Sequence, residues 1–550
     1  MVPKYSILFF TVCFFANHSF GQIAQRDTAK KQQVVEITSE YKPVLRNAVK
    51  INFSATNLTA DTSKAKLQYD IPTQNLFYTY LPLPVKPLAL QLDTALDLGT
   101  RNFIKLGFGN YSTPYAKGGF SFGDGKKSLI NVYGDYISSS NSAIKYQDYS
   151  QFNAKATASY FTPKNELYGS AGISQNTYNL YGYDHTIYTD YTQDSVRQRF
   201  SDLKLMGGIR NLKSTESGIK YDPNLKIDLF SLQNKLTENS LILNAPAEKT
   251  FDNDFTIKVA AKVDATTFST TGLLVNVTNA HNNVYQLAPS VELSGERFAL
   301  HAGIAPTWDN SQLSILPDIY AEFPIKNKVF EVQAGWVGQI LKNTYQNLTN
   351  INPYLLPITS QLNTREMEFY AGIKATVGKH FNFNAKASLI TYHNLPLLVN
   401  DTTDYKSFVV RNETKANDFR VHADFSYINQ DKFTLTSGFT INGYTGLQDN
   451  SHAWGMIPIE LNASLRWWAY KSLLIKGDLN AFGGAPYLLK NNVSNTLSGG
   501  SDLSIGAEFV INKKFSAWLD FNNLLNNKYQ RWYNYPVYGL NALIGVIYKF

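Results

Sequence analysis

Long runs in which every second residue is apolar constrain this sequence more than any other feature. Between Asp418 and Ile428, apolar and polar side chains alternate. A period of two places the two sets on opposite faces of an extended strand. The apolar set is Phe419, Val421, Ala423, Phe425 and Tyr427, and the polar set is Asp418, Arg420, His422, Asp424 and Ser426.

The same alternation recurs in segments 255–262, 381–389, 433–442 and 473–480. A soluble β-sandwich would bury the apolar face and expose the polar one, whereas a membrane barrel turns the apolar face to lipid and the polar face to its lumen. Strand length separates the two classes. These runs reach about 9 to 13 residues, as a tilted transmembrane strand requires, and sandwich strands are usually about 5 to 6 residues long. We therefore predict an all-β fold, a transmembrane antiparallel β-barrel.

Composition supports a membrane barrel and excludes several other classes. Aromatic residues make up 14% of the chain and charged residues 17%, below the roughly 25% of charged residues in ordinary domains. After the N-terminus, no stretch approaches about 18 consecutive apolar residues, which excludes a helical membrane protein. The net charge of +8 comes from lysines scattered along the chain, so we expect no nucleic-acid partner. The surplus would face anionic lipid headgroups or an anionic lumenal solute.

The first 21 residues have the features of a cleavable secretory signal. Lys4 is its basic region, Ile7–Ala16 its apolar core and Ser19–Gly21 a cleavage site, and the core is too short to span a bilayer as an anchor. The only cysteine, Cys13, lies in this signal, which excludes a disulfide or thiolate site in the mature chain. We expect a signal peptide over 1–21, a periplasmic or lumen-threading extended segment over 22–99, and an outer-membrane β-barrel over 100–550.

Short polar turns alternate with long connections, as in bacterial outer-membrane barrels. Ten short turns imply eleven hairpins, hence roughly 22 strands, with a range of about 16 to 22. We expect short turns at 123–126, 162–165, 211–217, 264–267, 294–297, 326–328, 378–380, 429–432, 470–472 and 512–514, and long connections at 181–198, 233–250, 342–363, 393–415 and 485–498.

The last strand carries a further signal of an outer-membrane barrel. The chain ends in Phe550, and Tyr548 and Val546 share its face. This pattern resembles the C-terminal signal by which the outer-membrane insertion machinery recognises barrels. We therefore expect that machinery and outer membrane lipid as partners, with both ends of the barrel in the periplasm.

The segment Phe521–Phe550 resembles the C-terminal end of TonB-dependent receptors. Their last hairpin has an Asn-Leu-hydrophobic-Asn run followed by Lys-Tyr, an aromatic loop with Tyr-Pro and Gly, and a strand that finishes on Phe. The resemblance implies the barrel of that family and a role in solute transport or reception. The matching positions are Asn523, Leu524, Leu525, Asn526, Lys528, Tyr529, Tyr535, Pro536, Gly539 and Phe550.

A short segment near the N-terminus resembles a TonB box, which pairs with the periplasmic protein TonB by strand addition. The segment consists of Val34, Val35, Glu36, Ile37 and Thr38, and Glu36 interrupts its apolar run. The alternative is a β-prone segment without this role. The resemblance implies TonB, or another periplasmic partner, as a ligand of residues 22–99.

The globular plug of that family is missing from this sequence. Only about sixty residues separate Glu40 from Arg101, whereas a plug has more than about a hundred. Prolines at 72, 82, 84 and 87 make the segment extended. A barrel of roughly 22 strands is wide enough to need a filling. The candidates are the 22–99 segment, inward-folded loops, or a partner protein.

We expect no catalytic residue, no metal site and no cofactor, because the chain has no HExxH or GxxxxGK[ST] motif. The polar face 418–424 is interpreted as a hydrated, mutually paired lumen wall. Aromatic residues of two loops are the best ligand candidates, since they would stack on sugars or apolar ligands; the alternative is a girdle at the lipid–water interface. They are Tyr178, Tyr181, Tyr183, Tyr188 and Tyr191 in one loop, and Trp532, Tyr533, Tyr535 and Tyr538 in the other.

These features favour a TonB-dependent-receptor-like outer-membrane barrel that acts as a transporter or receptor component for an unidentified solute. One alternative is a plugless structural barrel in an envelope assembly or secretion complex, with residues 22–99 docking a partner. Another is a passive channel for hydrophobic molecules. The missing plug favours the structural barrel, whereas the C-terminal hairpin favours the receptor.

Overall fold

The computed structural model describes residues 102–550, apart from 234, 252–253, 272–276, 296, 326–328, 379 and 430–431. The signal peptide, the TonB-box-like segment 34–38 and the proline-containing segment of the N-terminal region lie outside the described residues. The account below concerns the described part of the chain.

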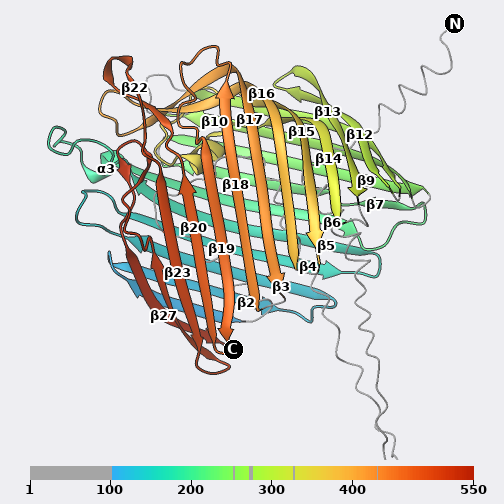
Figure 1. Ribbon diagram of the computed structural model, residues 1–550, viewed down its shortest axis with the longest axis horizontal. Helices are drawn as coiled ribbons and strands as arrows, with labels where there is room; N and C mark the ends of the chain where they lie inside the picture. The colour runs from blue at the N-terminus through green and yellow to red at the C-terminus, as the bar shows by residue number, and fades with distance from the viewer. Residues whose placement is uncertain are drawn as a thin grey trace, which may run out of the picture. The chain divides into compact units, whose positions relative to one another are not determined.

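The described chain folds into one closed antiparallel β-barrel of 22 strands (Figure 1), which confirms the predicted fold class and strand number. The strands are β1 (Phe103–Gly109), β2 (Thr113–Phe122), β3 (Ser128–Ser139), β4 (Tyr149–Phe161), β5 (Asn165–Asn179), β6 (Arg197–Asn211), β8 (Asn224–Leu232), β9 (Leu236–Phe251), β10 (Phe255–Thr270), β11 (Val277–Ser294), β12 (Ala299–Asp309), β13 (Gln312–Ile325), β14 (Phe330–Leu341), β15 (Thr364–Val377), β16 (Phe381–Asn400), β17 (Phe408–Asn429), β18 (Phe433–Thr445), β19 (Ile459–Tyr470), β20 (Leu473–Phe482), β23 (Gly500–Val510), β24 (Phe515–Asn522) and β27 (Asn541–Lys549).

Each barrel strand pairs with the next barrel strand along the chain, and the last pairs with the first. β27 closes the barrel on β1 in a register that runs from Phe103↔Lys549 to Gly109↔Leu543. A short strand, β7 (Ile219–Tyr221), precedes β8 and pairs with the same neighbour, β9. Pro223 lies between β7 and β8 and has no N–H to donate to a sheet, so the two pieces form one interrupted strand.

Several short elements lie in the long loops. Two-stranded sheets join β21 (Pro486–Leu488) to β22 (Ser494–Thr496) and β25 (Gln530–Trp532) to β26 (Tyr535–Pro536). The helices are α3 (Gln193–Val196), α4 (Tyr345–Ile351) and η1 (Lys490–Asn492). No helix of the described chain is long and apolar enough to cross a membrane.

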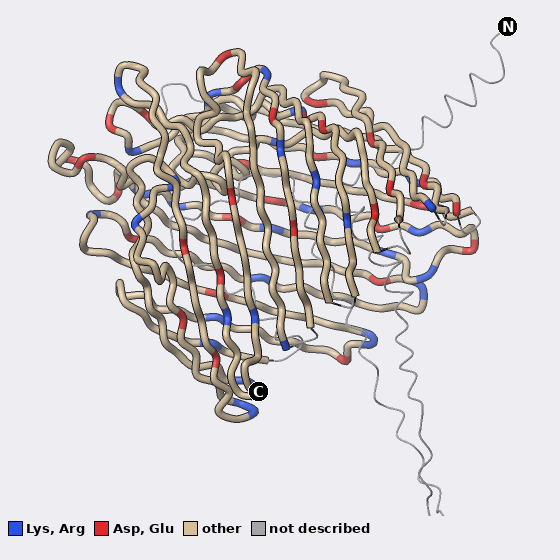
Figure 2. Tube along the Cα trace, viewed as in Figure 1, with Lys and Arg blue, Asp and Glu red and all other residues tan. Residues whose placement is uncertain are grey.

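The alternating pattern has the orientation of a membrane barrel. On β17, Phe419 is 52% exposed, whereas Asp418 and Arg420 are 1% and 7% exposed. The apolar set therefore points outward and the charged set lines the lumen, which is the reverse of a soluble sandwich. Charged residues occur along the strands as well as at their ends (Figure 2).

Nine of the ten predicted short turns lie at strand connections, and one is wrong. Residues 264–267 belong to the middle of β10, and the turn lies instead between Phe251 of β9 and Phe255 of β10. Asp264 and Thr266 resemble turn residues in sequence, but both are lumen-facing side chains with partners in a loop. Their polarity marks an inward contact and not a chain reversal.

Two predicted long connections are also too long. Segment 233–250 is mostly strand, because β9 begins at Leu236. Segment 393–415 shrinks to 401–407, because β16 and β17 extend to Asn400 and Phe408. The predicted loops are too long because the strand ends carry polar residues, although their backbone remains paired in the sheet. The long connections 180–196, 342–363 and 483–499 agree with prediction.

Candidate functional site

The loop between β14 and β15, residues 342–363, folds into the barrel and carries the short helix α4. Tyr345, Tyr354 and Leu355 are at most 1% exposed. Side chains of a loop that projected into solvent would be more exposed than this. The loop instead contacts lumen-facing side chains of β6, β8, β9 and β10, so it obstructs the lumen at the end with the long loops.

Glu238 on β9 binds the beginning of α4. Its carboxylate accepts hydrogen bonds from the backbone N–H groups of Tyr345 (2.8 Å) and Gln346 (3.4 Å), and from Nε2 of Gln361 (2.7 Å). The first N–H groups of a helix have no intrahelical acceptor and carry partial positive charge, so a carboxylate is a favourable partner. One wall residue therefore holds both ends of the loop.

Gln346 extends this anchor to two neighbouring strands. Its Nε2 donates to Oδ2 of Asp202 on β6 (2.9 Å) and to Oδ1 of Asp228 on β8 (3.2 Å). Each carboxylate also has a cation on its own strand, with Lys204 Nζ at 2.5 Å from Asp202 and Lys226 Nζ at 3.0 Å from Asp228. Each of the two carboxylates that Gln346 contacts is therefore balanced by a cation.

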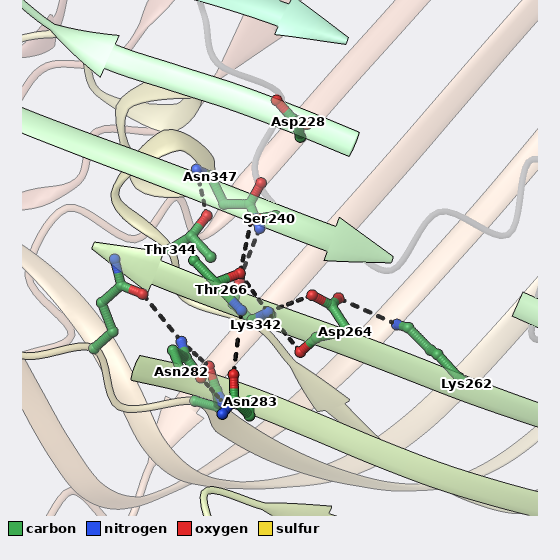
Figure 3. Close-up of polar contacts among 12 residues, drawn as sticks. Asp228, Ser240, Lys262, Asp264, Thr266, Asn282, Asn283, Lys342, Thr344 and Asn347 are labelled. Atoms are coloured by element: carbon green, nitrogen blue, oxygen red, sulfur yellow. Dashed lines mark hydrogen bonds and ion pairs between the residues drawn. The ribbon is translucent and has the colours of Figure 1, made fainter. Parts of the chain in front are cut away.

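Lys342 makes the second anchor of the loop (Figure 3). Its Nζ donates to the Asp264 carboxylate, to the Asp264 carbonyl (3.0 Å) and to Oγ1 of Thr266 (2.6 Å). Thr266 also shares a 2.7 Å hydrogen bond with Ser240 on β9. All three ammonium protons have acceptors. Lys262 approaches the same carboxylate at 3.8 Å but is itself far more exposed.

Tyrosines from three loops pack together above α4. The rings of Tyr354 and Tyr535 stack with centroids 3.5 Å apart, and Tyr181 meets them edge-on at 5.9 Å and 4.8 Å. Burial raises the pKa of Tyr181 to about 12 and that of Tyr354 well above its usual value, so both phenols are neutral at physiological pH. This cluster joins loops 180–196, 342–363 and 523–540 into one lid.

A polar contact ties loop 180–196 to loop 401–407. Tyr191 donates its hydroxyl proton to Oδ2 of Asp404 (2.6 Å), and Lys406 Nζ donates to Tyr191 Oη (2.9 Å) and to the same carboxylate. Burial alone would raise the pKa of Asp404, but the hydrogen bonds from Lys406 and Tyr191 outweigh it and lower that pKa. Asp404 therefore stays ionised and holds the two loops together.

The structure brings the predicted aromatic ligand residues together, but most of them face one another. Tyr181, Tyr183, Trp532 and Tyr535 are all buried. Tyr533 is the exception: it is half-buried and stacks on Tyr487 at 4.1 Å. A role of the four buried residues in ligand binding stays a prediction, and it would require the loops to separate.

The lumen wall below the lid is polar and internally paired. Arg420 donates to Asp418 (3.0 Å), to Tyr392 Oη (2.7 Å) and to Asn442 (2.9 Å). His422 and Asp424 are 2.8 Å apart. Among the described residues, no group of three or more histidine, cysteine or carboxylate side chains could hold a metal ion. The predicted cluster is therefore a wall of fixed ion pairs.

Sequence reasoning placed loop 342–363 correctly but did not identify it as the loop that folds into the outer end of the barrel. The available signal was its composition. A loop that contains Tyr345, Leu348, Tyr354, Leu355 and Leu356 has too many large apolar side chains for an aqueous surface. Inward-folded loops were among the expected fillings, and this loop is one.

The sequence matches no protein-family model and no curated protein, whereas the fold matches solved structures of TonB-dependent receptor barrels. The FrpB iron transporter of Neisseria meningitidis (F3-3 variant) superimposes with a TM-score of 0.64 at 11% identity, over 82% of this chain and 81% of that one. A mutant of the ferric enterobactin receptor PfeA of Pseudomonas aeruginosa gives 0.59 at 10%, over 82% and 81%. The FpvAI–pyocin S2 complex gives 0.60 at 11%, over 82% and 70%. At this identity the likeness establishes the fold alone: the described chain has the barrel fold of TonB-dependent receptors.

Proposed function

We propose that this protein is a transporter or receptor component that handles a solute through a lumen closed by its own loops. The observation that supports this most is loop 342–363, which lies inside the barrel and is held by Glu238 and Asp264 of the wall. The loop is not one of the paired barrel strands, so it can be released without unfolding the barrel. The fold, which the barrel shares with an iron transporter and a ferric enterobactin receptor, agrees with such a role.

The polar lumen argues against a passive channel for hydrophobic molecules. Lumen-facing positions of β17 are Asp418, Arg420, His422 and Asp424, and ion pairs of this kind bind water in preference to apolar solutes. The solute we propose is therefore hydrophilic. The proposal assigns no catalytic residue, and it interprets the His422–Asp424 contact as part of the paired lumen wall.

We place the protein in the outer membrane after removal of residues 1–21. Val546 and Phe550 are about half exposed on the outer face of the last strand, where the insertion machinery could contact them. With an even number of strands, both ends of the barrel lie at the short-turn end, which we assign to the periplasm. Residues 22–99 would then start from the periplasmic side.

From there residues 22–99 would enter the lumen from below or bind a periplasmic partner, with Val34–Thr38 as the candidate contact for TonB. The 22-stranded barrel has no separate plug in its described part, and barrels of this size are normally filled. Loop 342–363 closes the outer end only. A second seal or a partner at the inner end would complete the closure.

The test compares the full chain with a deletion of Ser39–Leu90 that keeps the signal and Val34–Thr38. Planar-bilayer conductance and co-purification from native membranes in mild detergent are measured for both. A transporter or receptor component whose lumen is closed by residues 39–90 should show higher conductance after the deletion and should keep a TonB contact, because Val34–Thr38 is retained. Stable association with an envelope assembly complex, with conductance unchanged by the deletion, would instead identify the structural barrel.

A further inference from the structure

A row of basic side chains crosses three neighbouring strands near the long-loop end of the barrel. Arg365 on β15 is directly opposite His393 on β16, and His393 is directly opposite Lys415 on β17. We call these three residues the basic row. Their strands lie side by side (Figure 1). Since neighbouring strands are about 4.8 Å apart, the Cα atoms of Arg365 and Lys415 are about 10 Å apart. Both side chains can therefore reach one ligand.

The basic row points away from the lumen. Phe369, Leu389 and Phe419 are on the outward-facing side of the same three strands, and all are more than half exposed. Each member of the basic row is four residues along its strand from one of them, and the pairing between the strands has no bulge in this interval. An even spacing along a strand keeps side chains on one face. The basic row is therefore on the outer surface of the barrel.

The basic row lies just beyond the apolar band of that surface. On β16 the outward-facing residues from Phe381 to Leu389 are apolar, Thr391 is polar, and His393 follows. The apolar stretch has nine residues (381 to 389), and a tilted transmembrane strand needs about 9 to 11. In the outer membrane, the basic row would be at the level of the lipid headgroups of the outer leaflet.

The basic row finds no counter-ion among the described residues. Neither Arg365 nor Lys415 forms an ion pair with a described residue, whereas the lumen cations Lys258 and Lys374 are each paired with a glutamate. Cations on one face of neighbouring strands repel one another. An anionic ligand would remove this repulsion, and long basic side chains can extend along the surface to meet it.

An open groove of about 650 Å³ lies on the same surface, farther toward the short-turn end. Its floor is a row of alanines directly opposite one another across β13, β14, β15 and β16. Its wall on the side of the basic row includes Trp336 and Phe369, whose rings stack at 5.2 Å. Because the alanine side chains are far smaller than these rings, the groove suits a narrow hydrocarbon chain. The alanines are Ala321, Ala334, Ala371 and Ala387.

We propose that this surface binds a phosphorylated lipid of the outer leaflet, with its phosphate groups on Arg365 and Lys415 and an acyl chain in the groove. Guanidinium and ammonium groups form strong charge-assisted hydrogen bonds with phosphate. Six residues of β15 separate Arg365 from Ala371, or about 20 Å along the strand. With a strand tilt of about 45° this is a depth of about 14 Å, within the roughly 15 Å of one leaflet. The inference goes beyond the proposed transport and rests on the proposed outer-membrane location.

The test uses the full chain in an uncharged detergent and native mass spectrometry, which resolves bound lipid. The probes are diphosphoryl lipid A, its phosphate-free form and inorganic phosphate, and we expect the diphosphoryl lipid to bind most tightly. The double variant Arg365→Gln with Lys415→Gln should weaken its binding roughly 30-fold, since each cation near an anionic lipid surface contributes about a fivefold gain. The matched control, Lys471→Gln with Lys513→Gln, removes two exposed cations at the short-turn end and should change binding less than about twofold.

A second variant tests the groove without changing any charge. Ala371→Phe should fill the groove and weaken lipid binding at least about threefold, because the acyl chain loses packing contacts. Heat-modifiable gel mobility confirms that each variant folds. The proposal is overturned if diphosphoryl lipid A does not bind, if the double charge variant binds it as the control does, if Ala371→Phe binds it as the wild type does, or if inorganic phosphate binds as tightly.

The same spectra identify a second copy of the chain as the alternative occupant. A dimer mass that Ala371→Phe abolishes would assign the groove to a subunit interface and overturn the lipid site. Lipid binding is measured without transport, and membrane fractionation tests the location separately. A failure of lipid binding is therefore distinguishable from a failure of the proposed function.

Discussion

Replacing Lys342 with Met should release loop 342–363 from the wall. The substitution keeps most of the side-chain volume and removes three hydrogen bonds, two to Asp264 and one to Thr266. Both Lys342 and Asp264 have side chains about nine-tenths buried. Removing one partner of a buried ion pair costs about 3–5 kcal/mol, because the other charge stays buried without compensation. Lys262 at 3.8 Å compensates in part, so we take the lower value.

A cost of about 3 kcal/mol increases the undocked population of the loop roughly a hundredfold, since about 1.4 kcal/mol corresponds to a factor of ten. The barrel keeps its strand pairing, so the effect should stay local. Hydrogen–deuterium exchange of peptides from 342–363 should accelerate by about that factor, and brief openings should become frequent in single-channel recordings.

Lys262→Met is the matched control. Lys262 approaches the same Asp264 carboxylate, but its side chain is 42% exposed, and exposed pairs contribute about 0–1 kcal/mol. The control should therefore exchange nearly as the wild type does. Equal exchange in Lys342→Met and wild type, or equal acceleration in both lysine variants, would refute the argument that Lys342 anchors the loop.

Three further predictions concern the lid and the barrel end. Tyr354→Ala removes a fully buried ring, which should destabilise the packing of the lid by about 3–5 kcal/mol. Hydrogen–deuterium exchange should then accelerate in all three loops that the ring joins, and wild-type exchange rates in these loops would contradict this. Phe550→Ala removes contacts with two aromatic neighbours, each worth about 0.5–1.5 kcal/mol, and should lower the folded fraction on a heat-modifiable gel; an unchanged fraction would argue against the C-terminal signal. The contact of Asp404 with Lys406 should be constant above pH 4 and weaken as pH falls further. The reason is that the pKa of Asp404 lies below its usual 3.8, so its contribution to stability is lost only as pH falls through that lowered value. Exchange of peptide 401–407 measured against pH tests this, and a loss of protection already at pH 6 would contradict it.

The barrel could be predicted from the sequence because its signals are local. Alternation along one strand fixes which side chains face lipid, as Phe419 and Asp418 demonstrate. The terminal strand also predicts its own face, since Val546 and Phe550 point outward. Counting turns gives the strand number because each turn is a short segment with its own composition.

The lid could not be predicted because its contacts join residues far apart in sequence. Tyr345 meets Glu238, and Tyr181 meets Tyr535. Nothing in either segment alone identifies its partner. The one wrong turn has the same cause: Asp264 and Thr266 of β10 are polar because they bind Lys342 of a loop distant in sequence. The prediction of a turn therefore fails at the residues that hold the loop.

The positive charge of the described part of the chain has a definite distribution. Cations in the lumen such as Lys105 and Lys258 are paired with carboxylates, so they contribute no surplus there. The described residues of the short turns include nine exposed cations and only three acidic residues, whereas those of the long loops include seven of each sign. The surplus therefore gathers at the short-turn end, which favours anionic headgroups of the adjacent leaflet over a lumenal solute as its counterpart. The nine cations are Lys126, Lys127, Lys164, Lys213, Arg297, Lys432, Lys471, Lys513 and Lys514, and the acidic residues are Asp124, Glu216 and Asp254.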